Sequence, residues 1–250
     1  MPILHVAIPH HDEPDTLPVL FDRIAAAPLP VGWSRRVVVC DDASPPAALD
    51  VAARSIARLA ERGIRAILLR HETQRGKGAA VRTAFGTILD RADDEDAVVL
   101  QDADLEYDPA DHAALLARHE DGAEAVFGSR WTRRGAASLG PVQRIGNWML
   151  TLASNAMTGQ RLSDMECGLK LLSVPVLRRI VGELDEEGFG IEPQITASLA
   201  RNGVRIDEVA VSYAPRTVAE GKKISWRDGL EALRVIRREQ RRRAPTASAT

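Results

Sequence analysis

Short apolar runs alternate with stretches of helical periodicity along the first half of the chain. The apolar runs cover residues 4–8, 36–40, 64–69, 97–100 and 123–128. Helix-like patterns lie between them, over residues 15–26, 46–62, 78–91 and 109–119. This alternation is typical of βαβ units, in which a parallel sheet is covered by helices on both faces. We therefore expect an α/β fold with a mostly parallel central sheet flanked by helices.

Each apolar run is followed by a polar loop. The loops read "PHHDE" (9–13), "DDASP" (41–45), "RHETQRGKGAA" (70–80), "QDADLE" (101–106) and "SRW" (129–131). Any one of them is compatible with an ordinary solvated turn or helix cap. However, an open parallel sheet binds its ligand outside the carboxyl ends of its strands, and all five loops share that edge. The pattern predicts a ligand site there.

The loop after the fourth run carries a concentration of carboxylates. Asp102 and Asp104 are two residues apart at a strand end, so both side chains can face one cavity, where they would repel each other unless a cation lies between them. Carboxylate oxygens without convergent His or Cys suit Mg²⁺ or Mn²⁺ held mainly through the phosphates of a substrate. Such a D-x-D triplet also occurs by chance in many loops.

The segment "RGKGAAVR" supplies groups that favour phosphate. Gly76 and Gly78 would allow close approach of a ligand, Lys77 adds charge, and a helix opening at Gly78 would present free N–H groups to an anion. The spacing is not that of a P-loop. The alternative is a plain helix start.

Composition narrows the class of protein. With 250 residues, 45% of them hydrophobic, the chain can bury one substantial core. A formal net charge of -2 gives no general attraction to nucleic acid. The two cysteines, Cys40 and Cys167, argue against a structural zinc site and fit a reducing compartment. Neither a signal peptide nor an apolar span of about 20 residues is present, so we expect a cytoplasmic protein, soluble or peripheral on the cytoplasmic membrane face.

Several motifs, taken in order, resemble one enzyme family. They are "IPHHDE", "DDAS", "RHETQRGKGAAVRTAF", "LQDADLEYDP", "VFGSR", "SDMECGLKLL", "FGIEPQITASLAR" and "RTVAEGKKISWRDGLEAL". Together they resemble family 2 glycosyltransferases of the GT-A fold, over about residues 4–237. The branch containing dolichyl-phosphate mannosyltransferase and bacterial polyprenyl-phosphate glycosyltransferases is the most similar.

The resemblance implies one GT-A, Rossmann-like domain over residues 1–215. Its nucleotide-sugar half would end near residue 130 and its acceptor half would cover 131–215. An acceptor-side loop and a basic amphipathic helix would follow over 216–240, with a disordered tail at 241–250. The implied reaction is the inverting, metal-dependent transfer of a hexose from a nucleotide-diphospho-sugar, GDP-mannose or a UDP-sugar, to a polyprenyl or dolichyl phosphate.

The resemblance also assigns donor-side roles. Those facing the nucleotide and sugar would be Pro9, Asp12, Glu13, Asp42, Gln74, Gly76, Lys77 and Asp102. Asp42 would accept hydrogen bonds from the base, and Asp102 would hold both ribose and metal. Asp104 and Glu106 would be further ligands of the Mg²⁺ or Mn²⁺ cofactor, and Arg130 would face the phosphates.

This chain departs from the family pattern in the donor pocket. Asp12 replaces the usual Asn, His11 the usual aromatic residue, Ala43 the glycine of "DDGS", and Gln74 the usual Asn. The base and the sugar are therefore left open, whereas the predicted metal ligands are unaffected.

The acceptor decides whether a general base is needed. A hydroxyl acceptor requires one, and Asp164, Glu166 and Glu192 are the candidates. A lipid phosphate is already ionised and needs cations instead, for which the candidates are Arg130, Arg216, Lys222 and Lys223. A soluble hydroxyl acceptor therefore stays as the alternative to the lipid phosphate.

The C-terminal segment predicts an amphipathic helix. Trp226, Leu230, Leu233 and Ile236 fall near one face, and the helix ends in "RREQRRR". These arginines could meet anionic lipid headgroups, which would give a peripheral membrane contact. Alternatively, the apolar face packs on the domain and the arginines are solvated.

Two other classes of protein compete with the transferase. A non-catalytic nucleotide-sugar binding module is disfavoured because metal, phosphate and acceptor-side motifs are all present. A nucleotidyltransferase also uses paired aspartates and a Gly/Lys loop, but would release diphosphate instead of a nucleoside diphosphate.

Overall fold

The computed structural model describes residues 1–131, 141–216 and 226–242, with side chains from 144 and from 231 in the second and third ranges. Seven strands form one sheet in this part of the chain, in the order β3-β2-β1-β4-β6-β5-β7. The strands are β1 (Ile3–His10), β2 (Ser34–Asp41), β3 (Arg65–Arg70), β4 (Ala97–Leu100), β5 (Ala125–Ser129), β6 (Lys170–Ser173) and β7 (Ile206–Ala210). All neighbouring pairs are parallel except those of β6, which runs antiparallel to β4 and to β5.

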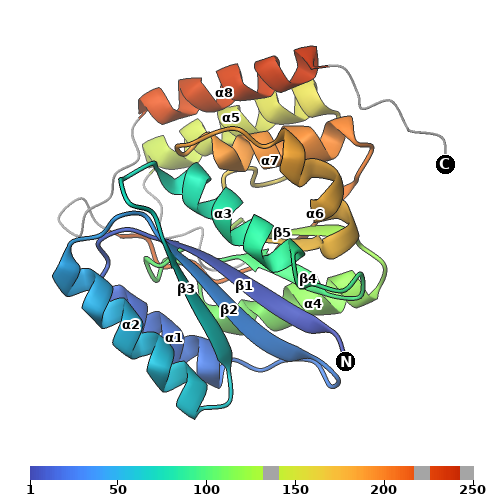
Figure 1. Cartoon of the computed structure of the whole chain (residues 1–250). Helices are drawn as coiled ribbons and strands as arrows, with labels where there is room; N and C mark the ends of the chain where they lie inside the picture. Colours follow the sequence, from blue (N-terminus) through green and yellow to red (C-terminus); the bar gives the residue numbers. More distant parts are fainter. Residues whose placement is uncertain (132–140, 217–225, 243–250) are drawn as a thin grey trace.

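Helices cover both faces of the sheet (Figure 1). The helices are α1 (Thr16–Ala26), α2 (Pro46–Glu61), α3 (Lys77–Leu89), α4 (His112–Glu120), α5 (Pro141–Thr158), α6 (Val174–Ile180), α7 (Ile191–Arg201) and α8 (Trp226–Arg241), with short 3₁₀ turns at Pro109–Asp111 and Val181–Glu183. Helices α1, α2 and α4 pack their apolar residues against one face of the sheet. Helices α3, α6 and α7 pack theirs against the other face. Helix α8 packs beside α5 and α7 in an outer layer (Figure 1).

Local sequence explains where several elements begin. Pro46 occupies the first turn of α2, where a missing N–H costs nothing. Ser173 caps α6 by accepting a hydrogen bond from Val176 N at its side chain. In the same way, Asp108 accepts from Ala110 N at the 3₁₀ turn before α4, at 3.0 Å.

The predicted α/β class and mostly parallel sheet are confirmed. All five predicted strands and all four predicted helices of the first half are present, with ends shifted by at most a few residues. Strand β6 comes from the segment expected to form the acceptor half, and it lies in the same sheet between β4 and β5. None of the helices that the structure describes has the length and apolar character needed to span a membrane.

Candidate active site

The first two strands end side by side at the predicted edge. His10 pairs in register with Asp41, and His10 Nδ1 lies 2.8 Å from Asp41 Oδ1. The other Asp41 oxygen accepts from Ser44 N at 3.1 Å. Asp12 N donates to Ser44 Oγ at 2.8 Å, and Asp12 itself is exposed in the left-handed region, with φ 51°. The two loops therefore brace each other.

Asp42 anchors the loop that precedes α3. Its Oδ1 accepts from His71 Nδ1 at 2.7 Å and from Arg75 N at 2.9 Å, and its Oδ2 accepts from Gly76 N at 2.7 Å. Burial alone would raise the pKa of Asp42, but these hydrogen bonds hold it below its ordinary value. Asp42 is thus an ionised group that organises the loop before α3, and its expected contact with a base stays a prediction.

The glycines of "RGKG" make room for protein backbone, which corrects the expectation that they admit a ligand. A Cβ on Gly76 would lie 2.4 Å from the carbonyl oxygen of Glu187, and one on Gly78 would lie 2.3 Å from that of Glu186. The Glu187 carbonyl also accepts from Ala79 N at 3.2 Å. The N-terminus of α3 is therefore covered by residues 186–188 and does not present all of its N–H groups to an anion.

Lys77 lies between two carboxylates from distant parts of the chain. Its Nζ is 2.7 Å from Asp102 Oδ1 and 2.6 Å from Glu192 Oε1. Burial opposes the charge of Lys77, but the two carboxylates raise its pKa. Burial raises the pKa of Asp102 to about 6, although Lys77 opposes the rise. The donor-side lysine and the D-x-D motif predicted from sequence therefore do come together.

Close packing holds this cluster in place. A Cβ on Gly168 would lie 2.6 Å from Asp102 Oδ2 and 3.5 Å from Glu192 Oε1, so any larger residue there would displace the Asp102 carboxylate. Gly168 N donates to the Tyr107 hydroxyl at 3.1 Å. The "SDMECG" loop thereby reaches the D-x-D motif directly.

Arg216, which follows β7, binds the loop that follows β1. Its guanidinium binds Glu13 through two parallel contacts of 2.9 Å each, and its Nε donates to the Asp104 carbonyl at 2.8 Å. Arg216 N donates to Glu106 Oε1 at 2.9 Å, and the Tyr213 hydroxyl donates to Glu106 Oε2 at 3.1 Å. Arg216, Glu13 and Glu106 are therefore brought together at the site as predicted, but they bind one another.

The residues fit a divalent cation only in part. Asp102 and Asp104 offer hard oxygen ligands, and burial followed by repulsion from Glu106 raises the pKa of Asp104, although Lys77 and Arg216 oppose the rise. Yet no three His, Cys, Asp or Glu side chains within the described ranges converge to hold a metal by themselves. Because Glu106 is engaged by Tyr213 and Arg216, the expected set of Asp102, Asp104 and Glu106 is not assembled. Asp102 and Asp104 remain the predicted ligands.

Arg130 and Asp164 form a buried ion pair. Arg130 Nε and Nη2 each donate to one Asp164 oxygen at 2.6 Å, and Arg130 N adds a third contact at 3.0 Å. Asp164 is fully buried, and the Arg130 guanidinium lies 5.0 Å from the centre of the Tyr213 ring. The Arg130 guanidinium therefore binds Asp164 and does not point towards an open phosphate site. Because Asp164 is fully buried and paired with Arg130, its environment is that of a structural residue and not that of a general base.

Glu166 has a different environment from Asp164. Its Oε1 is buried without a hydrogen-bond partner in the described part of the chain. Burial, with repulsion from Glu192, raises the pKa of Glu166 to about 7. Of the carboxylates proposed as a base, Glu166 is therefore the one poised to exchange a proton near neutral pH.

The sequence gives no sign that Lys170 belongs to the site, because it is simply the first residue of the short strand β6. It is 1% exposed, and its Nζ donates to the carbonyls of Met165 (3.3 Å) and Cys167. It also lies 4.6 Å from the centre of the Phe127 ring. This buried cation therefore holds the "SDMECG" loop in place through two of its backbone carbonyls.

The remaining predicted residues are more peripheral. Pro9 is buried within β1, and Gln74 is exposed on the loop before α3. Lys222 and Lys223 lie outside the described residues, as does the predicted tail from residue 243.

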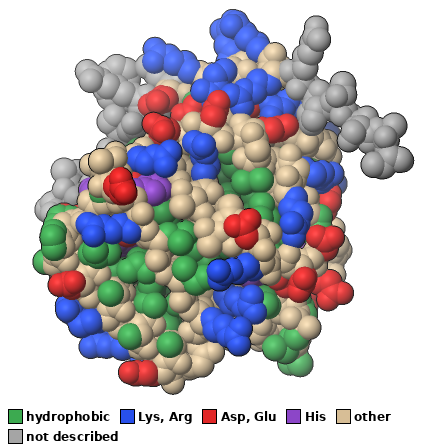
Figure 2. All heavy atoms as spheres, viewed as in Figure 1, with side chains coloured by type: hydrophobic (Ala, Val, Ile, Leu, Met, Phe, Trp, Pro, Cys, Tyr) green, Lys and Arg blue, Asp and Glu red, His purple; other side chains and the backbone are tan. Residues whose placement is uncertain are grey.

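The arginines near the end of α8 form two groups, one that makes ion pairs with acidic residues and one that is exposed. Arg238 binds Asp185 and Glu186, at 2.8 Å each, and Arg242 binds Asp185. Arg234, Arg237 and Arg241 are exposed. Lys and Arg side chains gather over α8 in Figure 2, with acidic side chains directly beneath. The apolar face of α8, including Val235 and Ile236, is buried.

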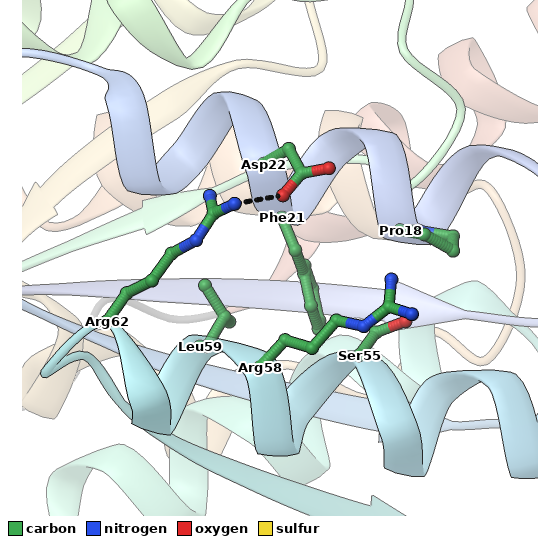
Figure 3. A pocket seen from close by; sticks show the side chains of 7 residues that line it. All are labelled: Pro18, Phe21, Asp22, Ser55, Arg58, Leu59 and Arg62. Carbon is green, nitrogen blue, oxygen red and sulfur yellow. Dashed lines mark ion pairs between the residues drawn. The ribbon is translucent and has the colours of Figure 1, made fainter.

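A crevice between α1 and α2 lies apart from the predicted site. It is lined by Pro18, Phe21, Asp22, Ser55, Arg58, Leu59 and Arg62 (Figure 3). An Arg62–Asp22 ion pair of 2.9 Å bridges the two helices there. The crevice contains none of the residues at the strand ends.

Comparison with solved structures agrees with the overall fold. Among solved structures, the fold is similar to glucosyl-3-phosphoglycerate synthase from Mycobacterium tuberculosis in complex with Mn²⁺, uridine diphosphate and phosphoglyceric acid. The TM-score is 0.67 at 18% identity, covering 98% of this chain and 80% of that one. The fold is that of the GT-A glycosyltransferases.

Sequence comparison defines the family. The model described as "Glycosyl transferase family 2" matches residues 5–181, so the chain belongs to that family. It is 31% identical to an undecaprenyl-phosphate mannosyltransferase of Micrococcus luteus, over 86% of this chain and 85% of the relative. It is also 26% identical to a polyprenol monophosphomannose synthase of Mycolicibacterium smegmatis, over 87% of this chain and 79% of the relative. The chain is a glycosyltransferase of the polyprenyl-phosphate branch.

Proposed function

We propose that this enzyme transfers a hexose from a nucleotide-diphospho-sugar to a polyprenyl phosphate with inversion at the anomeric carbon. The observation that carries the proposal is the convergence of Lys77, Asp102 and Glu192 at the strand ends, in a chain whose relatives are named as polyprenyl-phosphate mannosyltransferases. Lys77 matches the charge of a diphosphate, and Asp42 fixes the loop that carries Lys77.

A divalent cation would be held by Asp102 and Asp104 together with the donor's phosphates. When bound, it supplies charge neutralisation for the departing diphosphate. The chain's own groups position the reaction: Lys77 binds the donor, Gly168 sets the distance between the "SDMECG" loop and Asp102, and Arg216 keeps the 104–106 loop against Glu13.

In the proposed step, an oxygen of the lipid phosphate forms a bond to the anomeric carbon. The bond from that carbon to the diphosphate breaks, and the nucleoside diphosphate leaves with the electron pair. No proton must be removed from an ionised phosphate, which is consistent with Asp164 being held by Arg130. Lys222 and Lys223, by their place in the sequence after Arg216, are the proposed cations for the acceptor.

A soluble hydroxyl acceptor is the second candidate, and Glu166 favours it. Its pKa of about 7 and its buried, unpartnered Oε1 are the properties of a general base.

One assay separates the two candidates. The purified chain is incubated with GDP-mannose or UDP-glucose and Mn²⁺, either with detergent-solubilised undecaprenyl phosphate or with small hydroxyl acceptors, and products are identified by mass spectrometry. A polyprenyl-phosphate hexose, formed by wild type and by Glu166→Gln alike, supports the lipid phosphate. Product only with a hydroxyl acceptor, lost in Glu166→Gln, supports the second candidate.

A further inference from the structure

Helix α5 carries a stripe of apolar residues on its outer face. Ile145, Trp148, Met149 and Leu152 are spaced as i, i+3, i+4 and i+7, so they share one face, and each is 55–61% exposed. The inner face buries Thr151 and Ser154, and Leu150 and Met157 pack against the core. Helix α5 therefore leaves a second apolar face uncovered, and exposed apolar surface of this kind marks an interaction site.

Hydrogen bonds fix the helix in this orientation. Thr151 Oγ1 accepts from Met165 N at 3.2 Å. Asn155 binds both the N–H and the carbonyl of Leu162, at 3.0 and 2.7 Å. Rotating α5 to bury its apolar face would break all three contacts. The outward stripe is therefore built into the fold.

Helix α5 itself packs on the proposed acceptor side of the site. Met165, which binds Thr151 on the inner face of α5, belongs to the "SDMECG" loop. Near the start of the helix, the Arg144 guanidinium lies 5.8 Å from the centre of the Trp131 ring, and Trp131 directly follows Arg130. A surface bound to the stripe would therefore be separated from the "SDMECG" loop by the width of one helix.

Exposed basic side chains lie on α5 and on the helix packed against it. Arg144 is exposed on α5 itself. Helix α8 packs alongside, where Gln240 Nε2 donates to the Met157 carbonyl, and its exposed residues Arg234, Arg237 and Arg241 have no ion-pair partner in the described part of the chain. This combination of groups matches the chemistry of an anionic bilayer surface. The apolar residues, which include a tryptophan, would contact acyl chains, and the unpaired arginines would contact phosphate headgroups.

We infer that the α5 stripe, Ile145, Trp148, Met149 and Leu152, together with the outer arginines of α8, is the surface by which the enzyme docks on an anionic lipid bilayer. The choice of a bilayer as the occupant rests on the proposed lipid acceptor. Docking through α5 would deliver the acceptor half of the site to the membrane surface.

Vesicle co-sedimentation tests the inference. The full chain is mixed with phosphatidylcholine vesicles with or without about 30% phosphatidylglycerol. The double variant Trp148→Gln/Met149→Gln should bind the anionic vesicles at least about tenfold more weakly than wild type, because it removes two inserting side chains. The matched control Val19→Gln/Val31→Gln changes two exposed apolar residues away from α5 and should bind like wild type. Arg234→Gln/Arg237→Gln/Arg241→Gln should lose the preference for phosphatidylglycerol and the sensitivity to salt.

Three outcomes would overturn the docking surface. The first is that the wild-type protein does not bind anionic vesicles. The second is that the Trp148→Gln/Met149→Gln variant binds them as tightly as the wild-type protein. The third is that the wild-type protein is a dimer in light scattering and the variant is a monomer, with no change in vesicle binding. Transfer to polyprenyl phosphate in detergent is measured in parallel. Transfer without vesicle binding would overturn the docking surface alone, whereas vesicle binding without transfer would overturn the proposed acceptor alone.

Discussion

Lys77 and Glu192 are 115 residues apart in the chain, yet Lys77 Nζ lies 2.6 Å from Glu192 Oε1. Because Lys77 also contacts Asp102 at 2.7 Å, one ammonium group joins the start of α3, the D-x-D loop and the start of α7. Among the described residues, Lys77 is the cation in direct contact with both of these carboxylates.

Lys77→Met should therefore weaken donor binding. A charge-assisted hydrogen bond contributes about 1.5–3 kcal/mol, so affinity for a nucleoside diphosphate should fall about 10- to 100-fold. Isothermal titration calorimetry measures this, with Lys77→Arg as the charge-conserving control, which should retain more of the affinity. Wild-type affinity in Lys77→Met would show that the lysine does not meet the donor.

Two glycines of α3 should respond in opposite directions to the same substitution. Gly78→Ala places a Cβ 2.3 Å from the Glu186 carbonyl oxygen and should destabilise the fold by about 1–3 kcal/mol. Gly86→Ala meets no atom within 4 Å and should stabilise it by about 0.5–1 kcal/mol through helix propensity. Urea denaturation gives both values. If Gly78→Ala were as stable as Gly86→Ala, residues 186–188 would not pack on the helix as described.

Asp164→Asn tests whether that carboxylate is an anchor or a base. Loss of the charge leaves Arg130 buried without its partner, which should cost about 3–5 kcal/mol of stability. The control Asp207→Asn affects a pair with the half-exposed Arg118 and should cost less than about 1 kcal/mol. A fully stable Asp164→Asn variant that loses about 10² to 10⁴ in rate would instead identify a general base.

Glu166 should make folding stability depend on pH. Its folded pKa of about 7 lies above the ordinary value of 4.5, so between these values the folded state holds a proton that the unfolded state has lost. Stability from this group is present below pH 4.5 and is lost as the pH rises through 7, by at most about 3 kcal/mol. Denaturation midpoints at pH 5 and pH 8 should differ less in Glu166→Gln than in wild type. Glu61→Gln, at the exposed end of α2, gives the background slope, and an equal slope in all three proteins would contradict the assignment.

Asp104→Asn should remove the metal-dependent part of nucleotide binding. In a thermal-shift assay, wild type should gain stability from UDP or GDP more strongly with Mn²⁺ than with a chelator, because a ligand that binds only the native state raises the melting temperature. The variant should show the same small shift under both conditions. Asp94→Asn, on an exposed loop, should behave as wild type. A variant that keeps the full Mn²⁺ effect would exclude Asp104 as a ligand.

The nucleotide half could be predicted from sequence because its signals are local. Buried strands such as Ala97–Leu100 are continuous apolar runs, and the helices between them keep a regular period. The motifs also placed Lys77 and Asp102 at one edge correctly. By contrast, β6 is only four residues long and antiparallel, and no local pattern indicates that it inserts between β4 and β5.

Pairings between distant residues could not be predicted in the same way. The sequence shows that Arg130 and Asp164 are charged, but not that each neutralises the other. The glycines at 76 and 78 indicate close approach without identifying what approaches, and the partner, residues 186–188, lies more than 100 positions away. Likewise, the exposed face of α5 depends on hydrogen bonds to Met165 and Leu162 that follow only from the folded chain.

The reversed direction of β6 has an evolutionary consequence. At the ligand edge the parallel strands contribute the loops that leave them, whereas β6, with Lys170 opposite Leu100, contributes the segment that enters it. That segment is secured by α5 on one side and by the sheet on the other. Because Gly168 of this segment packs against Asp102, substitutions in the segment would also disturb the D-x-D motif. Under the proposed function, the acceptor side and the donor side of the site would therefore have to change together among related enzymes.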